Sequence, residues 1–241
     1  MKNRKIWVML VGLFTALTSG FMGTTLTFAE ENEASQTIEQ PSYISDFPNQ
    51  VGNWQDLVGT AEKKNDSAGL WIANTKQGTN LESVSINLDA REQSSGDLEL
   101  TFLYEGQSNF GLVFRGDKQK TSQWQSFAYN RDGRWQLGQP GGKWLTNIPG
   151  PTLLSGQQYK LLVRYDGKKI QTFLNDQLFY ENEEVHYPDG TSINDDWTGA
   201  VGIRLFGNLS KLNIISMKSG SVGSIPVIDS SAERSEEHTS E

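Results

Sequence analysis

Short apolar or alternating runs, separated by Gly, Asn, Asp and Pro, follow one another from Tyr43 to about residue 218. None of them keeps a 3.6-residue hydrophobic period over a dozen positions, which excludes a helical fold. Alternation with a period of two is typical of strands that bury one face. The sequence therefore predicts an all-β antiparallel sandwich over residues 43–218. The expected strands are 54–61, 67–74, 81–88, 97–105, 109–115, 123–130, 134–138, 158–165, 168–174, 177–182, 198–206 and 208–217.

Three dipeptides have the composition of two-residue hairpin turns, namely Asp132-Gly133, Asp166-Gly167 and Asn175-Asp176. In the second of these hairpins we expect Val163 to lie opposite Ile170 on an apolar face. The register of a hairpin follows from its loop length, so each dipeptide also predicts which side chains meet.

The runs 97–105 and 109–115 are predicted to form another hairpin, closed around Gln107. Its register places Phe102 opposite Leu112 on one face, and Glu99 opposite Arg115 on the other. Because side chains alternate strictly along a strand, the acid and the base are expected to project from the same surface. Two interpretations stay open: a cross-strand ion pair worth about 0.2–1 kcal/mol, or one side of a polar binding site.

The first 29 residues have the layout of a signal peptide, with Lys2, Arg4 and Lys5 before an apolar run and small residues before Ala29. Residues 30–42 are acidic and polar, which predicts a disordered leader. Residues 219–233 are expected to be a linker. The final RSEEHTSE, 234–241, resembles a translated sequencing adaptor, and a natural disordered tail is the alternative. These features predict a secreted protein without a membrane anchor after cleavage, attached to the cell wall through a further C-terminal part or free.

Composition and missing motifs argue against several kinds of functional site. The chain has no cysteine, which excludes disulfides and thiolate sites. Its formal net charge of −8 argues against a nucleic-acid partner and is compatible with a neutral polysaccharide. His186 is the one histidine before the final tail, and we interpret it as a surface residue. Motifs of serine hydrolases, zinc enzymes and nucleotide-binding proteins are missing.

No cofactor is expected from these residues, with one option. The acidic loop 189–196, DGTSINDD, could hold a structural calcium ion through carboxylate and carbonyl oxygens. A catalytic carboxylate pair is not found, because Glu99 and Glu105 on one strand would lie about 20 Å apart.

Aromatic rings near strand ends, together with forked polar groups, are the residue types that hold sugars. Carboxylates accept from adjacent hydroxyls and arginine donates back in a fork. The bland alternative is that the rings belong to the core. The candidate carbohydrate-binding residues are Glu99, Arg115, Asp117, Tyr129, Asn130 and Trp135.

Four segments over about residues 54–217 occur in an order that resembles the family 66 carbohydrate-binding modules: NFGLVFRGD, QSFAYNRDGRWQL, QQYKLLVRYDGKKIQTFLNDQLFYE and GAVGIRLFGNLSKLNIISM. That resemblance implies a concanavalin- or laminin-G-like jelly roll. It also implies binding of the terminal sugar of fructans such as levan or inulin, next to a family 32 glycoside hydrolase. Glu99 and Arg115 fall on the family's acidic and arginine positions, and Asp117 on a variable polar one. The inserts QKTSQWQ and GQPGGKWLTNIPGP depart from the family pattern.

The resemblance thus predicts a non-catalytic fructan-binding module of a longer levanase or fructan β-fructosidase whose catalytic domain is missing from this chain. Two alternatives remain: a keto-disaccharide-type hydrolase acting by itself, and a laminin-G-like adhesion module. On the fructan interpretation, Glu99→Ala or Arg115→Ala should abolish sugar binding with little change in melting temperature.

Overall fold

A computed structural model describes residues 41, 43–46, 51–74 and 81–228. The signal peptide, nearly all of the leader and the tail 229–241 lie outside the described residues, so the expectations for them stay predictions. In the described ranges, no helix is both long enough and apolar enough to cross a membrane. The strands are β1 (Tyr43–Asp46), β2 (Trp54–Val58), β3 (Glu62–Asp66), β4 (Gly69–Ala73), β5 (Glu82–Asn87), β6 (Gly96–Tyr104), β7 (Asn109–Gly116), β8 (Gln125–Asn130), β9 (Arg134–Gln139), β10 (Lys143–Ile148), β11 (Gln157–Asp166), β12 (Lys169–Leu174), β13 (Gln177–Asn182), β14 (Ala200–Phe206) and β15 (Lys211–Gly220).

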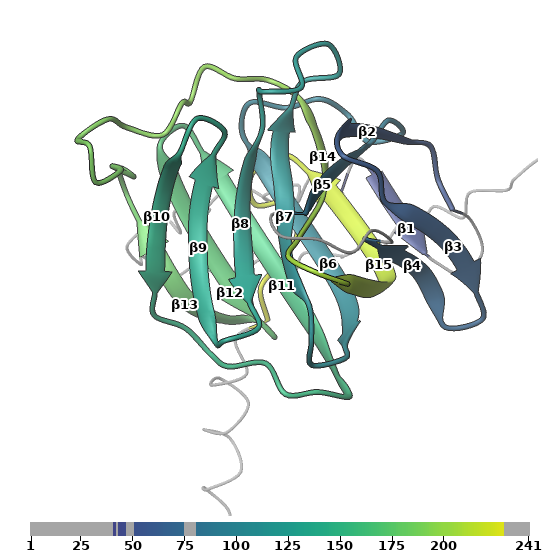
Figure 1. The fold of residues 1–241 in the computed structure, drawn as a ribbon. Helices are drawn as coiled ribbons and strands as arrows, with labels where there is room; N and C mark the ends of the chain where they lie inside the picture. Colours follow the sequence, from purple (N-terminus) through teal and green to yellow (C-terminus); the bar gives the residue numbers. More distant parts are fainter. Residues whose placement is uncertain (1–40, 42, 47–50, 75–80, 229–241) are drawn as a thin grey trace, which may run out of the picture. The chain divides into compact units, whose positions relative to one another are not determined.

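These strands form two antiparallel sheets that pack face to face (Figure 1). Sheet A has the order β13-β12-β11-β6-β15-β4-β3, and β1 adds to β15. Sheet B has the order β10-β9-β8-β7-β14-β5-β2. The predicted all-β antiparallel sandwich is confirmed, and each expected strand overlaps a strand of the structure.

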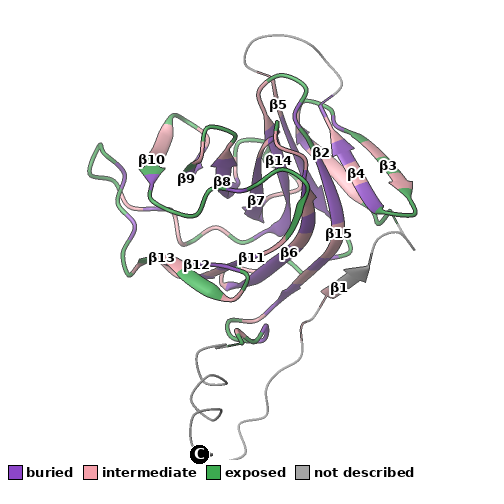
Figure 2. Cartoon of the chain, turned by 90° about the horizontal axis from the view of Figure 1, so that it is seen from below, coloured by how far each residue is buried: buried purple, intermediate pink, exposed green. Residues whose placement is uncertain are grey.

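The core lies between the sheets and follows the alternation read from the sequence. Phe102 and Phe110 meet edge to face across it, with ring centroids 4.8 Å apart. Leu100, Leu112 and Phe114 are fully buried in the same cluster. Figure 2 shows the strands largely buried and the connecting loops exposed. Burial of these faces is the dominant stabilising term for a chain without disulfides.

The hairpin predicted from residues 97–105 and 109–115 is wrong, and the predicted site depended on it. β6 pairs with β11 and β15 in sheet A, whereas β7 pairs with β8 and β14 in sheet B. The short connection between them crosses from one sheet to the other. The apolar faces of both strands do point into the core, as expected, but from opposite sides. Their polar faces therefore point away from each other.

The three predicted turns differ in detail. Asn175 and Asp176 both have positive φ (50° and 65°) between Leu174 and its partner Gln177, which is the two-residue turn expected. The β8–β9 loop has three residues, because Asn130 pairs with Arg134. In the β11–β12 hairpin, Asp166 pairs with Lys169 and Tyr165 with Ile170, so the predicted register is wrong by two residues.

Three strands were not expected: β1, β3 and β10. β3 has the sequence EKKND at an edge of sheet A, where charged residues are tolerated because one side of the strand faces water. β10 lies in the insert GQPGGKWLTNIPGP and is the edge of sheet B.

The chain packs beyond the expected domain boundary at residue 218. β15 continues to Gly220, and Ile225 is buried against Leu162 and Phe173 on the outer face of sheet A. The Asp97 carboxylate accepts hydrogen bonds from the backbone N–H groups of Gly223 and Ile225, both at 3.1 Å. Residues 221–225 are thus part of the folded module rather than of a linker.

Candidate functional site

Glu99 and Arg115 lie on different sheets and are both buried. Glu99 is 3% exposed on sheet A, where its carboxylate accepts from Lys218 Nζ at 2.9 Å. Arg115 is fully buried near the end of β7 in sheet B. The expected cross-strand pair does not form, because β6 and β7 face each other across the core instead of pairing as neighbours in one sheet.

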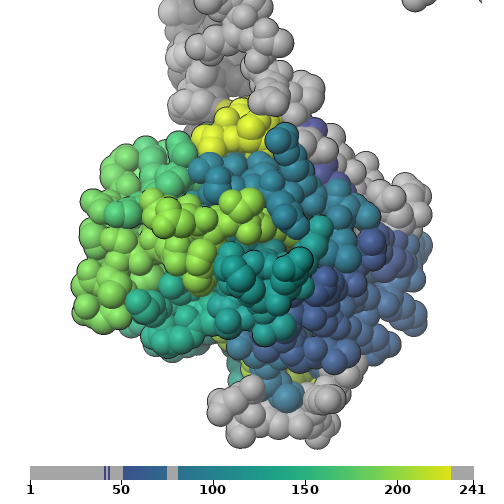
Figure 3. Space-filling model, turned by 90° about the horizontal axis from the view of Figure 1, so that it is seen from above, coloured from purple at the N-terminus to yellow at the C-terminus, as the bar shows by residue number. Residues whose placement is uncertain are grey.

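Arg115 is a structural residue that joins loops at one end of the sandwich. It has a φ of 56° beside an irregularity in the β7–β14 register, which turns the side chain away from its expected direction. Its guanidinium donates to the carbonyls of Ser94 (2.6 Å), Gly167 (2.7 Å) and Asn194 (3.2 Å), and to Gln125 Oε1 (2.8 Å). Figure 3 shows the loop segments of this end side by side. Burial lowers the pKa of Arg115.

The other four predicted residues do not gather around a site either. Tyr129 and Trp135 are core residues, 1% and 0% exposed. The Tyr129 hydroxyl accepts from Leu153 N–H at 3.1 Å, and Trp135 Nε1 donates to the Pro151 carbonyl at 3.0 Å. Asp117 accepts from Gln119 N–H at 2.7 Å within its own turn. Asn130 Nδ2 makes only a long contact, 3.5 Å, to the Arg134 carbonyl. The core interpretation of the two rings is the one that the geometry supports.

In the candidate calcium loop, Asp189 makes hydrogen bonds within the loop itself. Asp189 Oδ1 accepts from the Thr191 N–H at 3.0 Å and from the Thr191 hydroxyl at 2.7 Å. In the described part of the chain, no group of three or more His, Asp or Glu side chains could hold a metal ion. His186 is exposed, and its Nε2 lies 3.6 Å from Glu184 Oε1.

The outer face of sheet B, turned away from sheet A, has a different character. Small residues occupy the middle of its central strands: Gly111, Ser126, Ala128, Gly138 and Gly202. Register places Gly111 beside Ala128, and Ser126 beside Gly138. A Cβ atom on Gly138 would lie 2.1 Å from Trp144 Cε3, so glycine is what lets the indole of Trp144 lie against the sheet. This strip of small side chains makes room for larger ones from neighbouring strands and loops.

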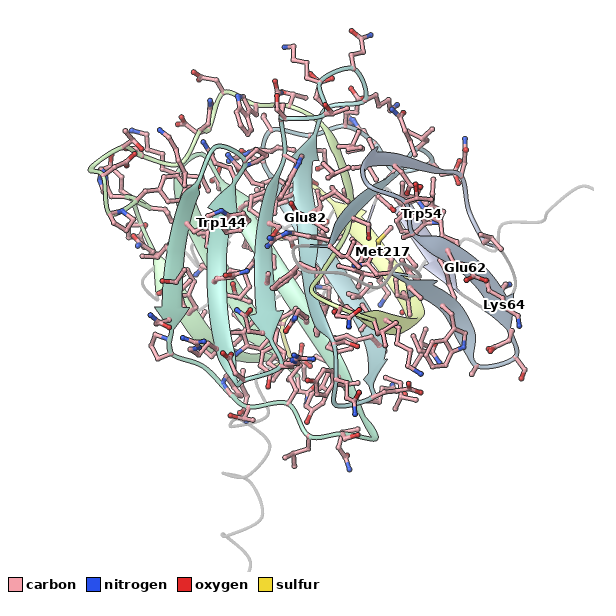
Figure 4. All side chains as sticks on the ribbon, viewed as in Figure 1. Trp54, Glu62, Lys64, Glu82, Trp144 and Met217 are labelled. Atoms are coloured by element: carbon pink, nitrogen blue, oxygen red, sulfur yellow. The ribbon has the colours of Figure 1, made fainter. Side chains whose placement is uncertain are left out.

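Five side chains fill that room, and we call them the outer-face cluster: Glu82, Trp124, Trp144, Arg204 and Phe206. The guanidinium carbon of Arg204 lies 4.2 Å from the ring centroid of Trp144 and 4.2 Å from that of Phe206. Stacking of a guanidinium on aromatic faces is favourable and fixes its plane. Figure 4 labels Glu82 and Trp144, which lie over the face of sheet B that is turned toward the viewer.

Arg204 in this cluster is only partly satisfied. Its Nε donates to Glu82 Oε1 at 2.5 Å. Its Nη1 is buried and has no hydrogen-bond acceptor among the described residues. Arg204 is 7% exposed, and burial lowers its pKa while the Glu82 carboxylate opposes that shift. A buried donor without a partner is costly, and it is often explained by a ligand or an ordered water.

Two more unpaired donors belong to the same surface. Among the described residues, Trp124 Nε1 and Ser126 Oγ are also buried without a partner. The Trp124 ring lies 5.6 Å from the Arg204 guanidinium and 6.2 Å from the Trp144 ring. A pocket of about 360 Å³ opens at the Arg204 end of the cluster. It is lined by Leu81, Glu82, Arg204, Phe206 and Gly207. Aromatic faces, a carboxylate and unused donors beside a hollow are the parts of a carbohydrate site.

Sequence reasoning did not select this cluster. Trp124 and Trp144 both come from the inserts that depart from the family 66 pattern. The available signal was Arg204 itself. Arg204 is the single charged residue in the otherwise apolar sequence AVGIRLF, which forms β14 in the interior of sheet B.

The comparisons with known proteins give a different relative from the one expected. No family model matches the chain. The chain is 98% identical over 233 residues to hyaluronate lyase HylB of Enterococcus faecalis (strain ATCC 700802 / V583). The alignment covers 97% of this chain and 23% of that relative, so the chain spans less than a quarter of the relative's length.

Solved structures with a similar fold have low sequence identity. A Bacillus subtilis protein of unknown function with a galectin-like fold has a TM-score of 0.54 at 14% identity, covering 76% of this chain and 96% of its own. A GlcNAcα1-4Gal-releasing endo-β-galactosidase from Clostridium perfringens has a TM-score of 0.52 at 10% identity, covering 78% and 64%. The carbohydrate-binding module CBM66 from Bacillus subtilis reaches 0.47 at 15% identity, covering 67% and 96%. The first two similarities support the fold alone.

The near-identical relative overturns the fructan interpretation. Its name describes a lyase acting on hyaluronate, whereas we expected a module of a levanase-like glycosidase. The assignment to the family 66 modules of fructan hydrolases, the glycosidase parent and the fructan partner are therefore wrong. The four matched segments are strands and hairpins of the sandwich, so their resemblance carried information on the fold and not on the ligand.

Proposed function

We propose that this chain is a non-catalytic carbohydrate-binding module of a secreted hyaluronate lyase, and that its ligand is hyaluronan. The proposal rests on the outer-face cluster, which combines aromatic faces with unused donors on a surface outside the core. The ligand comes from the near-identical relative, whose name is hyaluronate lyase. Hyaluronan alternates glucuronate and N-acetylglucosamine, and it offers apolar sugar faces, hydroxyls, amides and carboxylates.

The module would bind the polymer and leave cleavage to the rest of the lyase. Sugar rings stack on aromatic side chains through their C–H faces, while charged groups fix their orientation. Trp144 is half-buried at the edge of the sheet and offers such a surface. Holding the polymer on the module raises the effective concentration of substrate for a linked catalytic domain.

Affinity electrophoresis of the purified protein in gels containing hyaluronan or levan tests this function. We expect retardation by hyaluronan, none by levan, and no unsaturated uronate product in the ultraviolet spectrum. Trp144→Ala should weaken hyaluronan binding about tenfold, since a central aromatic contact is worth about 1.4 kcal/mol or more.

The matched control is Trp71→Ala, a half-buried tryptophan of β4 in sheet A. That variant should bind hyaluronan like the unchanged protein. If the Trp71 variant loses hyaluronan binding and the folded Trp144 variant keeps it, the site lies on sheet A, and the proposed site on sheet B is wrong. Release of unsaturated product by the chain alone would refute the non-catalytic role.

A further inference from the structure

The outer-face cluster contains an arginine whose only hydrogen-bonding partner among the described residues is an internal carboxylate. Arg204 donates through Nε to Glu82 Oε1 at 2.5 Å. Its Nη1 is unused, and so are Trp124 Nε1 and Ser126 Oγ. Arg204 Nη1 and Trp124 Nε1 can only donate, whereas the Ser126 hydroxyl can donate or accept, so what the cluster mainly lacks is acceptors. A ligand that completes it must bring acceptor atoms, and a carboxylate brings two oxygens that match a guanidinium fork.

The two members of the ion pair differ in burial. The Arg204 side chain is 9% exposed, whereas that of Glu82 is 32% exposed and lines the pocket of about 360 Å³. The Arg204 guanidinium carbon lies 4.2 Å from the ring centroids of both Phe206 and Trp144. The arginine is therefore fixed, and the carboxylate is the partner that can move. Outward rotation of Glu82 would open Arg204 to the pocket without repacking the sheet.

Long-range electrostatics make a local cation necessary. The chain has a formal net charge of −8, so its overall field repels a polyanion. A uronate polymer is held only if a positive group meets its carboxylate at close range, where aromatic walls reduce screening by water. Arg204 is the cation of the outer-face cluster.

From this geometry we infer that Arg204 recognises the uronate carboxylate of the ligand, and that Glu82 is an internal carboxylate that competes with it. The inference rests on the proposed function and names the group of the polymer that the module reads. Glu82 occupies the guanidinium in the free protein and leaves it when an anionic sugar enters the pocket. The pair thereby selects acidic sugars over neutral ones, because only a carboxylate replaces the lost ion pair.

Calorimetric titration with two ligands and four proteins tests the inference. The ligands are hyaluronan oligosaccharides and the same oligosaccharides with their carboxyl groups reduced to alcohols. The proteins are the unchanged chain, Glu82→Gln, Arg204→Lys and the control Glu105→Gln. Glu105 is a suitable match, because it pairs with Lys211 and its side chain has the same 32% exposure.

The unchanged protein should bind the reduced ligand at least about tenfold more weakly than the native one. Glu82→Gln frees the guanidinium and removes a like charge, so it should tighten native-ligand binding by about threefold or more. It should leave the reduced ligand unaffected, and Glu105→Gln should change neither. Arg204→Lys keeps the charge but loses the fork, so it should weaken binding of the native ligand, with its own urea unfolding showing that the fold is retained.

Equal affinity for both ligands would overturn the inference while the proposed function stands. Weaker binding of both ligands by Glu82→Gln would also overturn it, because Glu82 would then be accepting sugar hydroxyls. If neither the protein nor any variant binds either oligosaccharide, the proposed function fails and the inference fails with it.

Discussion

Two buried arginines in sheet B show how differently the same side chain can be used. Arg115, at the end of the sandwich, donates to three backbone carbonyls of separate loops and to the amide oxygen of Gln125 in β8. Arg204, on the outer face, has one carboxylate partner and an Nη1 that has no acceptor among the described residues. Both are more than nine-tenths buried, so burial alone does not separate them. The difference lies in the number of hydrogen bonds: an arginine with four of them holds the fold together, whereas one with a single partner can bind something else.

Replacement of each arginine by methionine tests this distinction most strongly. Arg115→Met removes four hydrogen bonds and should lower the free energy of unfolding by about 3 kcal/mol or more. Arg204→Met removes one hydrogen bond to a partly exposed carboxylate and should cost about 1 kcal/mol. Urea unfolding of both variants measures the contrast. Equal losses would mean that the number of hydrogen bonds does not distinguish the two roles.

This expectation reverses the one drawn from the sequence. Arg115→Ala was predicted to abolish sugar binding with little change in stability. Given its contacts, the substitution should instead destabilise the fold. If a stable Arg115 variant loses hyaluronan binding, Arg115 is a sugar-binding residue after all.

A third arginine offers an intermediate case on sheet A. Arg164 is paired bidentately with the buried Asp97, through Nε at 2.8 Å and Nη2 at 2.9 Å. The hydrogen bond to Asp97 raises the pKa of Arg164. Asp97→Asn weakens this fork and the capture of residues 223–225, so we expect a loss of about 2 kcal/mol.

Hydrogen exchange reads this effect locally, because the amides of Gly223 and Ile225 should lose protection before those of β6. Glu181→Gln, which alters an exposed pair with Lys169 in the same sheet, should change stability by less than about 0.5 kcal/mol. Retained protection of Ile225 in Asp97→Asn would show that apolar packing, and not the carboxylate, holds this segment.

The smallest effect concerns the aromatic residues. Tyr129→Phe removes the acceptor for Leu153 N–H in the core and should cost about 1 kcal/mol, with hyaluronan binding unchanged. Trp144→Ala should have the opposite profile, losing binding with a small change in stability. Thermal unfolding and affinity electrophoresis of the two variants show whether each ring stabilises the core or binds hyaluronan. Weakened binding by the Tyr129 variant would contradict its assignment to the core.

The sequence predicted the strands and their inward faces, because alternation reports local burial. It did not determine which strand lies beside which. Phe102 and Phe110 satisfy the same pattern whether their strands are neighbours in one sheet or opposite each other across the core. The predicted site depended on that choice, since Glu99 and Arg115 share a surface only in the first case. The αL backbone of Arg115 was equally hidden, because no glycine or asparagine marks it.

The outer-face cluster was beyond sequence reasoning for a related reason. Glu82, Trp144 and Arg204 come from three strands that are distant in the chain. In sheet B, β5 lies next to β14, but three strands separate β10 from β14, so Trp144 and Arg204 meet only because long side chains extend over the small residues between them. What the sequence did contain was Arg204 within an apolar strand, a local inconsistency of the kind that accompanies functional positions.

The position of β15 has a kinetic consequence. This strand is the last in the described chain, yet it inserts between β6 and β4 in the interior of sheet A. Its partner residues in β6 are more than a hundred positions earlier, as Lys218 and Glu99 are. Such distant pairing slows folding, and until it forms, β6 and β4 each present an unpaired edge. The module should therefore be most prone to self-association during synthesis, before β15 is available to complete sheet A.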